Sequence, residues 1–170
     1  MLLTLLRRTF FSAAVMLILL SAARTAFFAT YRVAGSSMEQ ALTDGDRILV
    51  GESGWLVEPV ERGDTVVFSV LDEILVKRIV GCPGDTLEMA RGKLIRNGIP
   101  VSESIPSHLN RDESFPRYTL LSGEYFVLGD HRRVSVDSRD FGPIGLDQVL
   151  GTVVLRMTGE GVMPIAGIAP

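Results

Sequence analysis

The sequence is poor in the side chains that mark disulfide frameworks and metal sites. It contains one cysteine, Cys82, and two histidines, His108 and His131. A single cysteine cannot form an internal disulfide, and no histidine and cysteine residues have the spacing of metal ligands. We therefore expect a domain without metal or cofactor, in which Cys82 is a small, half-buried apolar residue of a turn.

Positive charge is also scarce over most of the chain. The formal net charge is −3, yet residues 1–30 contain three arginines and no acid, so the rest carries 14 basic against 20 acidic side chains. Nucleic-acid binding needs a concentrated positive surface. The acidic body therefore excludes nucleic acid as an expected partner, and 170 residues suffice for one domain with a hydrophobic core.

The long apolar run is confined to the N-terminus. Residues 9–23 carry no charge, but at about 1.5 Å per residue they span about 22 Å of a ~30 Å hydrocarbon core. Extending the run to residue 29 includes Arg24, close enough to the outer end to reach the interface. We predict a transmembrane anchor over residues 9–29.

Arg7 and Arg8 precede this run and give the anchor a direction. Positive residues favour the cytoplasmic side, so residues 1–8 are predicted to be cytoplasmic and the body to lie across the bilayer. The protein is then a single-pass protein of the plasma (inner) membrane. The alternative is a cleavable secretory signal, which has the same charge and apolar pattern.

The body, residues 31–158, is predicted to be an extracytoplasmic, β-rich domain of all-β class, a barrel or a sandwich. Short β-branched and apolar runs alternate with Gly, Pro and Asp turns, as is typical of such folds. Residues 102–117 lack periodicity and are expected to form a long surface loop. The tail, residues 159–170, is expected to be irregular. The expected strands are residues 47–50, 65–70, 74–80, 86–90, 93–96, 118–121, 125–128 and 149–157.

Two adjacent serines, Ser36 and Ser37, lie in a glycine-led turn between the apolar run and the first expected strand. A serine hydroxyl attacks a carbonyl only if a neighbouring base takes its proton. His131 follows Asp130, so a Ser/His/Asp triad is one arrangement that these residues allow.

The chain contains only two lysines, Lys77 and Lys93. Lys93 lies at a hairpin turn, where water keeps the amine charged, whereas Lys77 lies in the apolar strand ILVKRIV. A catalytic lysine must lose its proton near pH 7 to 8, and each pKa unit below about 10.4 costs about 1.4 kcal/mol. Burial can supply that shift, and arginine cannot act in this way because it keeps its proton. Lys77 is therefore the candidate base, although a strand lysine on a barrel rim would look the same.

Five sequence blocks, in this order, resemble the type I signal peptidase family of bacterial type. Together they cover nearly the whole body. The blocks are GSSM at residues 35–38, GDTVVF at 63–68, VKRIVG with PGD at 76–81 and 83–85, YFVLGD at 125–130, and SVDSR with FG at 135–139 and 141–142.

The resemblance implies a membrane-anchored serine endopeptidase with a Ser/Lys dyad. Such an enzyme removes signal peptides from exported preproteins on the outer side of the membrane. The family's nucleophile, the serine before methionine, corresponds to Ser37, and its general base corresponds to Lys77. The Ser37 backbone N–H would help to bind the oxyanion, because Gly35 lacks the hydroxyl that some members place there.

The last block corresponds to residues that support the dyad in the family. We expect Ser135 to hydrogen-bond to the amine of Lys77 and orient it. Asp137 and Arg139 are expected to form a structural ion pair behind it.

Some residues differ from the family pattern. After a variable position, here Glu39, the family has a rigid proline and a threonine. Gln40 and Ala41 replace them, which predicts a looser turn, and His131 replaces an asparagine. Two alternatives remain open. One is a catalytically inert, membrane-anchored β module that binds exported partners. The other is a self-cleaving Ser/Lys regulator, although residues 1–30 have no room for its usual DNA-binding region.

Overall fold

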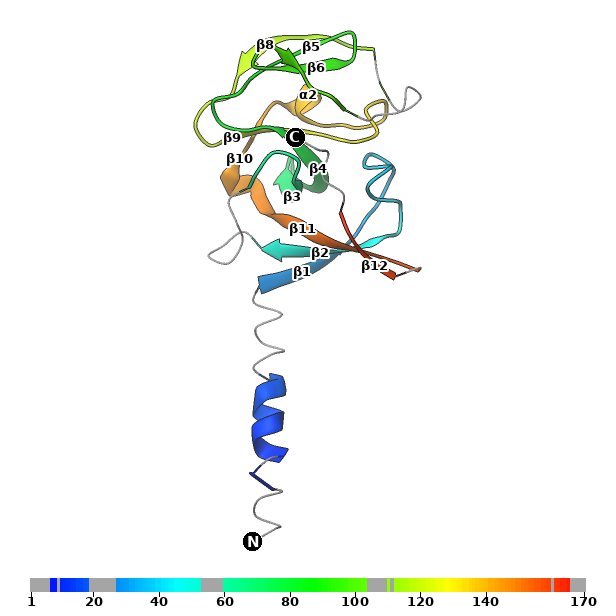
Figure 1. Ribbon diagram of the computed structural model, residues 1–170, viewed down its shortest axis with the longest axis vertical. Helices are drawn as coiled ribbons and strands as arrows, with labels where there is room; N and C mark the ends of the chain where they lie inside the picture. The colour runs from blue at the N-terminus through cyan, green and yellow to red at the C-terminus, as the bar shows by residue number, and fades with distance from the viewer. Residues whose placement is uncertain are drawn as a thin grey trace.

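The computed structural model describes residues 7–8, 10–18, 27–52, 60–103, 110, 112–159 and 161–165. Arg24, His108 and residues 166–170 lie outside this part of the chain. Residues 10–18 are helical and exposed, and Figure 1 shows them beyond the β1 end of the body. Within the described ranges, none of the helices has the length and apolar character needed to cross a membrane.

The larger sheet contains Lys77 in one of its strands, and the segment with Ser37 connects two of its strands. All its strand pairs are antiparallel. Its central strands are rich in β-branched and aromatic residues, which suit a pleated, buried surface. In order across the sheet, the strands are β1 (Phe28–Arg32), β2 (Arg47–Glu52), β11 (Val149–Thr158), β3 (Thr65–Val70), β4 (Glu73–Gly81), β9 (Glu124–Leu128) and β10 (Ile144–Gly145), with β12 (Gly161–Pro164) paired to β11.

A smaller sheet lies at the end of the body away from β1 (Figure 1). Its order is β7 (Ile99–Pro100), β6 (Lys93–Arg96), β5 (Thr86–Ala90) and β8 (Phe115–Thr119). The hairpin between β5 and β6 is confirmed, and it turns at Arg91 and Gly92 with φ of 51° and 72°. Two positive φ angles are what a tight two-residue hairpin requires.

The body is mostly β-sheet, as predicted, and two strands reach beyond the residue range expected for it. The anchor was expected to run to residue 29 and the domain to begin at residue 31, whereas β1 begins at Phe28. Phe28 and Ala29 pair with Gly51 and Val50 of β2, and these backbone hydrogen bonds hold them in the sheet. The tail is not wholly irregular either, because β12 pairs with the last four residues of β11, and Gly161, which begins β12, has a φ of 141°.

The expected loop over residues 102–117 also ends early. β8 begins at Phe115 and includes Pro116, which is tolerated because β8 is an edge strand. Two short helices were not predicted: α2 (Ser138–Phe141) and the 3-10 helix η2 (Leu146–Gln148). α2 exists because the Asp137 side chain caps its N-terminus, a local interaction that apolar periodicity does not reveal.

One hydrophobic core cluster fixes the turn that carries the two serines. Met38 and Leu42 lie in that turn, after the serines, and are fully buried against Ile48 and Val50 of β2 and Val67 of β3. Full burial of such a side chain is worth about 1.5 to 3 kcal/mol. The turn is therefore attached to the sheet by its own apolar side chains.

Candidate active site

Lys77 projects from the middle of the larger sheet. β4 lies between β3 and β9, and Lys77 pairs with Val66 of β3. Its side chain is only 3% exposed. Burial lowers the pKa of Lys77 from 10.5 to about 8, although the negative charges of Asp137 and Asp130 act in the opposite direction. The amine can therefore lose its proton near neutral to mildly alkaline pH.

Ser37 lies in a turn that backbone hydrogen bonds hold closed. Glu39 N donates to Ser36 O at 3.0 Å, and Leu42 N donates to Met38 O at 2.8 Å. The entry to the turn is fixed as well, because Gly35 N donates to a carboxylate oxygen of Asp44 at 2.8 Å. The sequence thus places Ser37 next to a buried methionine in a defined backbone conformation.

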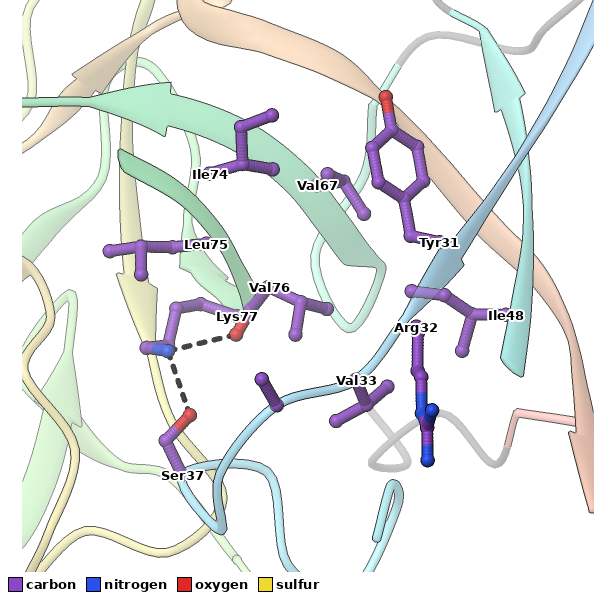
Figure 2. Close-up of a pocket in the computed structure, with 11 residues that line it drawn as sticks. Tyr31, Arg32, Val33, Ser37, Ile48, Val67, Ile74, Leu75, Val76 and Lys77 are labelled. Atoms are coloured by element: carbon purple, nitrogen blue, oxygen red, sulfur yellow. Dashed lines mark hydrogen bonds between the residues drawn. The ribbon is translucent and has the colours of Figure 1, made fainter. Parts of the chain in front are cut away.

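These two side chains meet. Lys77 Nζ lies 2.9 Å from Ser37 Oγ, and the same amine donates to the carbonyl oxygen of Val76 at 2.9 Å (Figure 2). Ser36 is exposed and has no side-chain hydrogen bond in the described part of the chain. The geometry therefore distinguishes the two adjacent serines and selects Ser37. Lys93 is exposed at its hairpin, as expected.

A pocket of about 120 Å³ opens beside the Ser37 and Lys77 side chains. This volume is below the roughly 150 Å³ of a cavity that holds a benzene ring, so the pocket is small. One wall comes from β1 and the residues after it, and the other from β4 (Figure 2). Its apolar lining residues include Tyr31, Val33, Ile48, Val67, Ile74 and Val76.

Asp137 and Arg139 form the predicted ion pair. Arg139 Nε lies 2.7 Å from one carboxylate oxygen of Asp137, and an Nη of Arg139 donates to the other at 2.8 Å. The Asp137 carboxylate also accepts a hydrogen bond from Gly129 N at 2.9 Å. Desolvation opposes the charge of Arg139, but its bonds to Asp137 and Glu113 outweigh this and raise the pKa of the guanidinium. The pair ties α2 to the segment after β9.

Comparison with known proteins identifies the family. The family described as signal peptidase, peptidase S26, matches residues 6–158. Signal peptidase I V of Bacillus subtilis (strain 168) is 34% identical over 158 residues, which cover 85% of this chain and 94% of the relative. Signal peptidase I of Bacillus amyloliquefaciens is 38% identical over 139 residues, covering 76% of this chain and 75% of the relative.

The chain belongs to the type I signal peptidase family. A crystal structure of a signal peptidase I from Enterococcus faecalis V583 shares 30% sequence identity, covers 56% of this chain and 97% of its own, and has a TM-score of 0.49. Membership makes this protein a serine endopeptidase of signal peptide processing, and neither of the two alternatives is retained.

The hydrogen bond that we expected between Ser135 and Lys77 is not formed in this signal peptidase. Ser135 is 3% exposed, and its Oγ has no hydrogen-bond partner among the described residues. The amine of Lys77 is bonded instead to Val76 O and lies against Ser37 Oγ. Ser135 lies close to Gly129, next to the Ser37 carbonyl, so it belongs to the same cluster without contacting the amine.

The Ser/His/Asp triad that the sequence allowed is not assembled. The Asp130 carboxylate is engaged by Arg78, whose Nε and an Nη donate to its two oxygens at 2.9 and 2.8 Å. His131 instead contacts the turn that carries Ser37. Its backbone N donates to Ser37 O at 3.0 Å, and its Nδ1 lies 3.0 Å from a carboxylate oxygen of Glu39. Among the described residues, no group of three or more His, Cys, Asp or Glu could hold a metal ion.

Three of the residues that support the site were missed from sequence. Arg78 is buried beside Lys77, and an arginine inside an apolar strand is a signal that a buried acid must lie elsewhere. Glu103 and Glu113 pair with Arg132 and Arg139, respectively. Nothing in their local sequence marks these glutamates, because each partner lies more than 20 positions away.

Proposed function

We propose that Ser37 is the nucleophile and Lys77 the general base with which this signal peptidase cleaves preproteins. The observation that carries the proposal is the 2.9 Å separation between Ser37 Oγ and the buried amine of Lys77. Burial lowers the pKa of that amine to about 8, so a useful fraction is neutral near pH 7 to 8. A neutral amine within hydrogen-bond reach of a hydroxyl meets the requirement for a base.

In the first step, Lys77 Nζ takes the proton from Ser37 Oγ as the oxygen attacks the scissile carbonyl carbon. The tetrahedral intermediate then collapses, and its C–N bond breaks. Lys77 gives the proton to the departing amine, which leaves as the new N-terminus of the mature protein. Ser37 is now acylated by the signal peptide's carboxyl end, and Lys77 is neutral again.

In the second step, Lys77 takes a proton from a water molecule that attacks the ester carbonyl. The bond to Ser37 Oγ breaks, and the proton returns to that oxygen. The signal peptide leaves with a free carboxylate. The reaction consumes one peptide bond and one water molecule, and both side chains are regenerated, so one lysine serves both halves of the reaction.

Negative charge develops on the scissile carbonyl oxygen and needs a hydrogen-bond donor to stabilise it. We assign this role to the Ser37 backbone N–H. Among the described residues, this N–H takes part in none of the hydrogen bonds of the turn. Gly35 has no side chain to add a second donor. Losing a single oxyanion donor typically costs about 100-fold or more in rate, so the free N–H is a valuable one.

Substrate position follows from the pocket. β1 is an edge strand of the larger sheet, and an extended substrate would add main-chain hydrogen bonds beside it. The small apolar pocket between β1 and β4 would then take short side chains next to the cleaved bond. Signal-peptide-bearing preproteins with small residues before the cleavage site are the proposed substrates.

The proposed site of action is the outer face of the plasma membrane. The anchor in the lipid bilayer lies within residues 9–29, of which Phe28 and Ala29 belong to β1. The proposal rests on their apolar character, on the helical state of residues 10–18 and on Arg7 and Arg8 before them. The attachment at β1 would bring the pocket, which β1 lines, toward the bilayer surface, where exported chains emerge.

The test is precursor processing in membranes that contain the full chain. Ser37→Ala and Lys77→Met should each abolish cleavage of an exported precursor, whereas Ser36→Ala should retain it. Ser36→Ala is the matched control because it removes the adjacent hydroxyl. Full activity of Ser37→Ala or Lys77→Met, or loss of activity in Ser36→Ala alone, would contradict the proposal.

A further inference from the structure

Glu39, at a position that varies in the family, contacts His131, which departs from the family pattern. Glu39 lies in the nucleophile turn, residues 36–42, and His131 lies in the turn after β9, 92 positions later in the chain. His131 Nδ1 is 3.0 Å from a Glu39 carboxylate oxygen. The sequence does not indicate that these two residues meet. In the structure they form one contact between the two turns.

The environment of His131 makes this contact specific. The imidazole is mostly buried, with its side chain 14% exposed, whereas that of Glu39 is 54% exposed. Nδ1 is shielded from water and has no aligned hydrogen-bond acceptor in the described structure. A buried ring nitrogen normally has a partner, and the Glu39 carboxylate is within reach of it.

A backbone hydrogen bond to the proposed nucleophile, Ser37, also joins these two turns. His131 N donates to Ser37 O at 3.0 Å. The side-chain contact two residues further on therefore gives a second point of attachment. It adds to the buried side chains of Met38 and Leu42, which hold the turn on the sheet, a restraint against the segment after β9.

The turn needs such support because its backbone is strained. Gln40 has a φ of 104°, a conformation that side-chain-bearing residues rarely adopt. A proline at this position would have φ near −65° and could not take it. This turn therefore lacks the stiffness that a proline supplies, and an external contact can replace it.

We propose that Glu39 and His131 are positioning residues that hold the Ser37 turn against the turn after β9. The inference rests on the proposed Ser37/Lys77 dyad. Neither residue lines the pocket, so the pair acts on the placement of Ser37 rather than on substrate binding. Its loss should lower kcat and the rate of acylation and leave KM unchanged.

The test is a double-mutant cycle on the full chain in detergent micelles, with a precursor as substrate. Glu39→Gln and His131→Asn should each lower kcat about two- to fivefold, the range expected for the loss of a partly exposed polar contact. The double variant should be no slower than the slower single variant, because both remove one interaction. Glu61→Gln, which removes a negative charge at another exposed position, should have the wild-type kcat.

Two results would overturn the proposal: multiplicative losses in the double variant, or wild-type kcat in both single variants. Thermal unfolding of each variant checks the fold, and His131→Gln completes the cycle if His131→Asn unfolds. The dyad is tested separately with Ser37→Ala in the same assay. An inactive Ser37→Ala with multiplicative losses refutes the positioning pair alone, whereas a fully active Ser37→Ala refutes both.

Discussion

At the scale of single residues, the chemistry depends on how Lys77 is placed. Its strand lies between two others, so the ammonium loses its water, and this burial outweighs the attraction of Asp137 and Asp130. The neighbouring Arg78 is buried equally well but is paired with Asp130 and keeps its proton. One buried cation can therefore act as a base, and the other supports the fold.

The pKa of Lys77 predicts how activity depends on pH. Only the neutral amine can accept the Ser37 proton, so kcat/KM should rise with pH and reach half its plateau near pH 8. Measurement of kcat/KM for precursor cleavage between pH 6 and 10 checks this. A profile that is flat across this range, or one with a midpoint near the usual histidine value of about 6.5, would contradict the assignment.

The same shift predicts a pH-dependent gain in stability for Lys77→Met. Below pH 8 the folded chain holds a buried charge, and the fall in pKa from 10.5 to about 8 corresponds to about 3 kcal/mol. As pH rises from 8 to 10.5, the folded chain loses its proton first, so this cost disappears. Denaturant unfolding gives the free energy of unfolding of Lys77→Met minus that of the parent. This difference should be about 3 kcal/mol larger at pH 7 than at pH 10.5. A difference that does not change with pH would refute it.

At the scale of elements, the close approach of two turns determines where Ser37 lies. A Cβ built at Gly129 would lie 2.5 Å from the Ser37 carbonyl oxygen and would also overlap the side chain of Ser135. Gly129 N meanwhile donates to Asp137. Glycine is required here because no side chain fits between the turn after β9 and the nucleophile turn.

Gly129→Ala should therefore impair catalysis. The backbone oxygen of Ser37 cannot move without moving the nucleophile, and a displacement of about 1 Å can cost about 100-fold in rate. We expect kcat to fall at least tenfold in a precursor-cleavage assay. Gly159→Ala is the matched control, since an added Cβ meets nothing within 4 Å there. Equal activity of the two variants would show that the turn tolerates the side chain.

Strands were more predictable from sequence than the contacts between turns. The boundaries of β3, β5 and β6 follow from β-branched runs and turn residues, and they were predicted as observed. β12 was missed because its four residues include a glycine and a proline, and only pairing with β11 makes them a strand. α2 was missed because a side-chain cap, rather than apolar periodicity, defines it.

At the scale of the whole molecule, the candidate site joins parts of the chain that are far apart in sequence. The dyad partners are 40 positions apart, and the Arg78–Asp130 pair is 52 apart. The sequence suggested Ser37 and Lys77 through chemistry and family resemblance. It could not indicate which acid pairs with Arg78, or that Glu39 meets His131, because those contacts depend on how the sheet folds.

The proposed orientation of the molecule predicts which parts a protease can reach. With the body outside the plasma membrane, a protease added to intact spheroplasts should digest an epitope placed after residue 165. An epitope before residue 1 should survive until the membrane is opened with detergent, because residues 1–8 are proposed to be cytoplasmic. The reverse pattern of protection, or protection of both epitopes, would contradict the proposed orientation.

The most direct test of the Ser37/Lys77 dyad is to find where a serine-directed acylating probe reacts. After reaction of the full chain at pH 8, mass spectrometry should place the acyl group on Ser37 and leave Ser36 unmodified. The labelling rate should follow the titration of Lys77, and Lys77→Met should abolish labelling without unfolding the protein. Acylation of another residue, or undiminished labelling of Ser37 in Lys77→Met, would contradict the account.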